Sequence, residues 1–191
     1  MARFDEVKAK FPGEGLHGVQ PPLTDAVVQD AGRRLGVRLP TSLLEILHVQ
    51  NGGSVADPWN AFQTDVPTSW SENHVPFDDM MGIGCHDGQL SLLDSPYLVA
   101  EWCLPSPLVL LSGDGHCWIA LDYRECGEQG EPSVTWFDVE ANTELPLAAD
   151  SQKFVERLAV ATSLDSDNGS RSASRSGSCR ASRVQDACPP E

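Results

Sequence analysis

The sequence lacks any long hydrophobic run. No apolar stretch in its 191 residues approaches the roughly 20 that a helix needs to cross a bilayer. The first residues, MARFDEVKAKFPGEG, also lack the apolar centre of a secretory signal. These two absences predict a cytoplasmic protein without a membrane partner.

Basic residues are scarce relative to acidic ones. The chain has 13 Lys and Arg against 28 Asp and Glu, which gives a formal net charge of −15. Residues 166–191 contain four arginines and three acidic residues, so the excess of acidic residues lies in the part of the chain before them. Such a surface repels nucleic acid and anionic membranes and attracts basic proteins. The alternative is an acidic surface that only keeps the protein soluble.

The sequence patterns of common catalytic and metal sites are also missing. The chain contains no HExxH, GxSxG, P-loop or HxE…PCxxC pattern. Its six cysteines form no Cys-x-x-Cys pair, which argues against structural zinc, and a cytoplasmic protein keeps its thiols reduced. We therefore expect no catalysis, no cofactor and no metal. An enzyme that pairs His74 or His116 with a nearby acid is the alternative.

The most informative stretch, residues 23–53, reads as two short helices. Thr24 can cap the start of the first helix, and Gly36 can take the left-handed conformation that ends it. Pro40 opens the second helix, since proline is tolerated in the first turn. Asn51-Gly52-Gly53 then ends that helix. The stretch carries no nucleophile or metal ligand, so it indicates a scaffold and not a reaction.

Elsewhere, short apolar segments alternate with turn residues. We expect a helix over residues 4–11, a long loop with short strands over 54–79, strands over 80–84 and 89–93, a helix over 97–102, a hairpin of 108–112 and 116–123, a strand over 133–139 and a last helix from residue 150. Helices at both ends of an antiparallel or mixed sheet indicate an α+β fold. Residues 165–191, rich in Ser and Arg, predict a disordered tail, which leaves residues 1–164 as a single domain.

Two blocks of the sequence carry a family resemblance. Residues 23–53 resemble the N-terminal signature of the SUKH superfamily, with a helix, the segment LGVRLP, a second helix and the motif NGG in that order. The segments LLDSPYLVAEW, LPSPLVLLSGDGHCWIALDYR and EPSVTWFDVE resemble the central strands of bacterial Smi/Knr-like proteins, in the same order. The resemblance covers about residues 20–160. It implies a SUKH-like α+β fold, and either a bacterial toxin-immunity protein or a regulator like the yeast cell-wall proteins of the group.

Candidate partner-binding residues follow the two-helix stretch. Loops on a rigid scaffold usually carry recognition, and strand 116–123 places alternate side chains on one face. Tryptophan is also a common core residue, and Arg124 can simply pair with an acid such as Asp122 or Asp138. The candidates are Trp70, Glu72, His74, Asp78, Asp79, Asp114, His116, Trp118, Asp122 and Arg124.

These features together predict a non-catalytic immunity protein. It would bind a basic toxin domain, a nuclease or a nucleic-acid deaminase, and block it by occlusion. The acidic surface would speed its encounter with a cationic active groove. The alternative is a non-catalytic regulatory scaffold of the Smi/Knr type.

Overall fold

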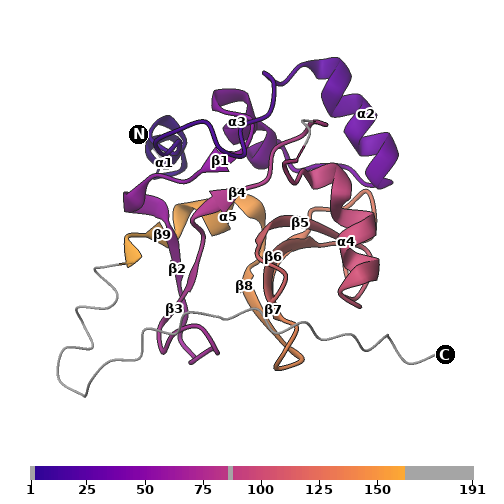
Figure 1. The fold of residues 1–191 in the computed structure, drawn as a ribbon. Helices are drawn as coiled ribbons and strands as arrows, with labels where there is room; N and C mark the ends of the chain where they lie inside the picture. Colours follow the sequence, from indigo (N-terminus) through magenta and orange to yellow (C-terminus); the bar gives the residue numbers. More distant parts are fainter. Residues whose placement is uncertain (1–2, 86–87, 162–191) are drawn as a thin grey trace.

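A computed structural model describes residues 3–85 and 88–161 (Figure 1). The expected disordered tail, residues 165–191, and the expected domain end at residue 164 lie outside the described residues. None of the helices in the described part has the length and apolar character required to cross a membrane.

The helices gather around the sheets, as an α+β fold requires. They are α1 (Arg3–Ala9), α2 (Asp25–Leu35), α3 (Thr41–Val49), α4 (Ser95–Glu101) and α5 (Ser151–Glu156), with the 3₁₀ turns η1 (Asp57–Trp59) and η2 (Leu92–Asp94). Helix α1 packs against α3 and α5, while α4 packs against β5 (Figure 1). The expected fold class is confirmed, with helices at both ends of the described chain.

The strands form three antiparallel sheets in the described residues. They are β1 (Gly53–Ser54), β2 (Ala61–Gln63), β3 (His74–Pro76), β4 (Asp79–Met80), β5 (Leu108–Gly113), β6 (Cys117–Asp122), β7 (Ser133–Asp138), β8 (Thr143–Ala148) and β9 (Leu158–Ala159). The sheet orders are β1-β4, β3-β2-β9 and β5-β6-β7-β8. The β2–β3 hairpin stands apart from the four-stranded sheet in Figure 1.

Local capping explains three helix ends. The Thr24 hydroxyl accepts a hydrogen bond from the Val27 N–H at 3.4 Å, and Gly36 ends α2 at φ 72°. Asp150 accepts from the Lys153 N–H at 2.7 Å and so starts α5. The expected two-helix unit and last helix are therefore confirmed.

Two expected strands are wrong. Residues 89–93 instead lead into η2, because Ser91 and Asp94 form a capping box. The Ser91 hydroxyl accepts a hydrogen bond from the Leu93 N–H, and the Asp94 carboxylate accepts one from the Ser91 N–H. Residues 80–84 contribute only Met80 to a strand, and Gly82 makes an isolated bridge to Ser91. Strands β8 and β9 have no counterpart among the expected elements.

The buried side chain of Asn51 explains the NGG motif. It is 3% exposed, and its amide donates to the carbonyls of Pro21 at 2.6 Å and Ile83 at 2.8 Å. Its oxygen accepts from the Ile83 N–H at 2.8 Å. Gly52 has φ 82°, and a Cβ there would overlap the backbone of Gly82. The motif thus ends α3 and also joins the end of this helix to the segments around Pro21 and Ile83 through hydrogen bonds.

Aromatic packing fixes the β2–β3 hairpin to the last helix. Phe62 of β2 stacks on Phe154 of α5 with ring centroids 5.1 Å apart. Phe77, just after β3, meets the same ring edge-on at 5.0 Å. All three rings are buried in the hydrophobic core. The hairpin therefore has a fixed position beside the four-stranded sheet.

Four of the six cysteines lie in the described part of the chain. Of these, Cys85 and Cys126 are free thiols. Cys103 is disulfide-bonded, so the expectation that the thiols are reduced is wrong for this residue.

Candidate partner-binding cleft

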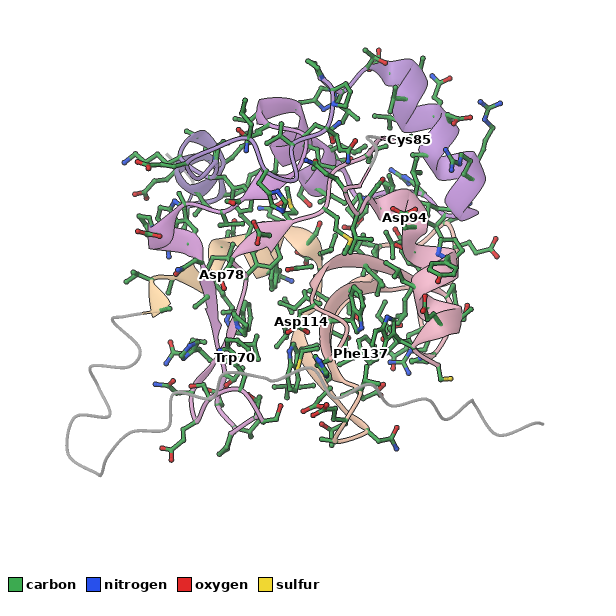
Figure 2. The ribbon with its side chains drawn as sticks, in the orientation of Figure 1. Trp70, Asp78, Cys85, Asp94, Asp114 and Phe137 are labelled. Carbon is green, nitrogen blue, oxygen red and sulfur yellow. The ribbon has the colours of Figure 1, made fainter. Side chains whose placement is uncertain are left out.

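A cleft of about 360 Å³ lies between the β2–β3 hairpin, the β1–β4 ladder and the turn of β5–β6. Figure 2 shows Trp70 on the loop of the hairpin, Asp78 close to β4 and Asp114 on the facing turn. We call this feature the tryptophan cleft, after three of its lining residues, Trp70, Trp118 and Trp136. It brings together five of the expected site residues: Trp70, Asp78, Asp79, Asp114 and Trp118.

The inner part of the tryptophan cleft is apolar. Met80, Met81, Trp118, Ile119 and Trp136 line it and are all buried. Ile119 of β6 and Trp136 of β7 are directly opposite in the sheet register, so their side chains share one face. The floor of the cleft is therefore built on rigid sheet and belongs to the core.

Trp118 is a core residue that reaches the cleft. It is 1% exposed, and its ring lies against Gly113, its partner across the β5–β6 pair. A Cβ at position 113 would overlap this ring, so glycine is required there for the close approach. The expectation that a tryptophan in this strand packs in the core holds for Trp118.

Three carboxylates stand at the rim of the cleft. Asp79 accepts a hydrogen bond from the Ser54 hydroxyl at 2.8 Å. Asp114 accepts from the N–H groups of His116 at 2.9 Å and Cys117 at 3.0 Å, so it closes the hairpin turn. In the described residues no hydrogen bond to the Asp78 carboxylate is found, and this side chain differs from the other two in that respect.

The pKa of Asp78 is raised above the usual value of an aspartate. Partial burial is the main cause, and repulsion from the carboxylates of Asp79 and Asp57 adds to it. The charge of His74 acts in the opposite direction. Asp78 is thus a carboxylate whose charge the folded protein does not fully compensate.

Trp70 lies on a loop that backbone hydrogen bonds close. Its side chain is 49% exposed. The loop is closed by hydrogen bonds from the Thr64 N–H to the Asn73 carbonyl and from the Thr68 N–H to the Ser71 carbonyl, both 2.8 Å long. An exposed aromatic ring on such a loop is available for contact without a large loss of backbone entropy.

Two expected loop residues do not line the cleft. His74 is buried at the base of the Trp70 loop, with Nδ1 at 3.0 Å from the Ser71 hydroxyl and 2.9 Å from the Asn73 side-chain oxygen. Glu72 is exposed on the same loop and is absent from the cleft lining. The hydrogen bonds of His74 indicate a role in holding the loop.

His116 lies outside the cleft lining as well. Its Nδ1 is 2.9 Å from a carboxylate oxygen of Glu140, and its ring is 6.4 Å from that of Trp102. The pair joins the start of β6 to the turn after β7, and it does not place the imidazole beside Asp78 or Asp114 in the cleft.

Asp122 and Arg124 form a separate group at the other end of β6. Arg124 donates to both oxygens of Asp122, at 2.6 to 3.0 Å, and to Glu144 at 3.0 Å, while its guanidinium lies over Phe137. Burial alone raises the pKa of Asp122, but hydrogen bonds from Arg124 lower it below the usual value. The expected pairing with Asp122 is confirmed, and it ties β6 to β8.

Several lining residues were not among the expected site residues. Trp136 sits in a strand that was expected, but the alternation of SVTWFDV does not reveal which side chains face a cleft. Leu90, which is 48% exposed, and Gln89 come from the segment expected as a strand. His17 comes from the region before α2. These segments are distant in the chain, so only the tertiary structure brings them together.

The lining has the character of a protein-binding surface. Within residues 3–85 and 88–161 no group of three or more His, Cys, Asp and Glu side chains lies close enough to hold a metal ion. Exposed Trp70 and Leu90 line the same cleft as the carboxylates of the rim. Aromatic and apolar contact area surrounded by charge is typical of protein-binding surfaces.

Comparison with known proteins places the chain in a family. No curated protein matches the sequence. The model of the SMI1 / KNR4 family (SUKH-1) matches residues 22–157, which include both blocks of the resemblance and most of the cleft lining. Because this match covers more than half of the chain, the protein belongs to the SMI1 / KNR4 family (SUKH-1).

Proposed function

We propose that this chain is an immunity protein that binds a basic toxin domain and blocks it by occlusion. Family membership supports a role of the immunity or Smi/Knr type. The observation that carries the proposal is the tryptophan cleft, where the exposed ring of Trp70 stands beside the carboxylates of Asp78, Asp79 and Asp114. The toxin would be a nuclease or a nucleic-acid deaminase, since such enzymes bind anionic substrates with cationic surfaces.

The charge of the whole chain supports the same proposal. A formal net charge of −15 attracts a basic partner over distances longer than a contact and raises the rate of encounter. Exposed Trp70 and Leu90 provide apolar contact area at the place where the acids gather. Aromatic residues in such positions often contribute a large share of the binding free energy.

Co-expression with the toxin domain encoded beside this chain tests the proposal. We expect cells to survive toxin expression only with this protein present, and the two purified chains to elute as one complex from a sizing column. Continued killing without a complex would refute the proposal. Recovery of several unrelated partners by the immobilised protein, with no toxin among them, would favour the regulatory scaffold.

A further inference from the structure

We infer that the tryptophan cleft takes up an arginine side chain from a loop of the partner. The class of partner rests on the proposed function. The chemistry of the cleft can be tested without any toxin, because it concerns a single side chain.

The lining of the cleft selects a cation with an apolar stem. Its lining residues include Trp70, Trp118, Trp136 and two methionines. Three carboxylates stand at the rim, and no lysine or arginine is among the described lining residues. An indole ring attracts a cation over its face, while apolar walls favour the methylene groups that carry it.

Arginine fits these walls better than lysine. Its guanidinium is planar, so it can stack on an indole ring while its N–H groups donate to carboxylates. Asp78 and Asp79 are neighbours that both line the cleft, and Asp114 stands on the facing turn. The ammonium of lysine is more strongly hydrated and does not stack, so it would lose more on entering an apolar cleft.

The environment of the Asp78 carboxylate favours binding of a cation. Its pKa is raised by partial burial and by repulsion from Asp79 and Asp57, against the opposite influence of His74. A guanidinium in the cleft would reverse this balance by supplying the opposite charge. Binding of the cation should therefore weaken as falling pH protonates Asp78.

A titration followed by the indole N–H signals tests the inference. The probe is N-acetyl-arginine N′-methylamide, which carries the guanidinium, added to the full chain labelled with nitrogen-15. We expect the indole signals of Trp70 and Trp136 to shift with an affinity of about 1 mM, as is reasonable for so small a ligand. The signal of Trp59, which is absent from the cleft lining, should stay in place.

Matched probes and variants make the result specific. The citrulline analogue keeps the shape without the charge and should not bind, and the lysine analogue should bind more weakly. Asp78→Asn with Asp79→Asn should weaken arginine binding about fivefold or more. The control, Glu125→Gln with Glu128→Gln, changes the net charge equally on an exposed loop and should have little effect.

Three outcomes would overturn the inference: an unmoved Trp70 signal, equal binding of citrulline or lysine, or equal loss in both double variants. The result is independent of the toxin experiment. Arginine binding without protection from a toxin would refute the proposed function alone. A toxin complex formed by a chain that does not bind arginine would refute this inference alone.

Discussion

Single buried polar residues hold distant parts of this protein together. Asn51 bonds to backbone groups of Pro21 and Ile83 through three hydrogen bonds. Asn60, which is less buried, accepts one bond from the Ala161 N–H at 3.0 Å. Loss of a buried partner leaves the other groups unsatisfied, so the two residues should differ in their contribution to stability.

Asn51→Ala should therefore lower the free energy of unfolding by about 3 kcal/mol, because three hydrogen bonds, two of them fully buried, lose their partner. Asn60→Ala is the matched control and should cost about 1 kcal/mol. Chemical denaturation of both variants measures the difference. Equal losses of stability in the two variants would show that the hydrogen bonds of Asn51 do not stabilise the fold as described.

Asp78→Asn should stabilise the free protein at neutral pH. The pKa of Asp78 is higher in the folded than in the unfolded chain, so stability falls as pH rises through the interval between the two values. The amide removes this cost, and we expect a gain below about 1 kcal/mol because water still reaches the side chain. At about pH 4 and lower, where the carboxyl is increasingly protonated in both states, the gain should shrink.

Denaturation of Asp78→Asn at both pH values checks this expectation, with Glu128→Gln as the control on an exposed loop. A variant that is less stable than the parent at neutral pH would contradict the described environment of Asp78. If Asp78→Asn is more stable than the parent and also binds arginine less well, Asp78 serves binding and not the stability of the fold.

At the scale of elements, the β5–β6 hairpin presents one wall of the tryptophan cleft. Asp114 closes its turn by accepting from two backbone N–H groups, and the same residue carries charge at the rim. The two roles can be separated, because asparagine keeps the accepting oxygen without the charge.

Asp114→Ala should lower the free energy of unfolding by about 1–2 kcal/mol, since both turn bonds are lost. Asp114→Asn should cost much less and should still weaken binding of a basic partner. Thermal unfolding and binding assays on the two variants distinguish the roles. Asp114→Asn as unstable as Asp114→Ala would mean that the charge itself holds the turn.

The elements that could be predicted from the sequence are those whose signals are local. Thr24, Gly36 and Asp150 cap helices through neighbouring backbone groups, so a short window of sequence reveals them. Strand β8 was missed because TELPLA does not alternate and contains Pro146; it forms by pairing with β7, where Trp136 lies opposite Leu145.

The cleft could be predicted only in part. Trp70, Asp78 and Asp79 belong to one loop, and the abundance of acidic and aromatic side chains there was a usable signal. Trp136 and Leu90 join them only through strand pairing and the path of the chain around η2. No periodicity in a single segment encodes such a meeting of distant residues.

At the scale of the whole molecule, the charge should act mainly on the rate of association. Replacing Asp78 and Asp79 by lysine should slow binding of a basic toxin about threefold or more and flatten its dependence on salt. Glu125 and Glu128 replaced by lysine give the same net charge away from the cleft lining and should have a smaller effect. Stopped-flow measurements at several salt concentrations test this; equal rates for both variants would exclude a local contribution of the cleft.

The central claim is that the partner binds at the tryptophan cleft, and the affinity of the toxin complex for two exposed-aromatic variants tests it most directly. Trp70, 49% exposed, lines the cleft, whereas Tyr97, 66% exposed, lies on α4 and is not among the lining residues. Calorimetric titration should show Trp70→Ala weakening the complex by about 2 kcal/mol, roughly thirtyfold. Tyr97→Ala should leave the affinity within about twofold of the parent. A Trp70→Ala complex as tight as the parent, or an equal loss for Tyr97→Ala, would contradict the claim.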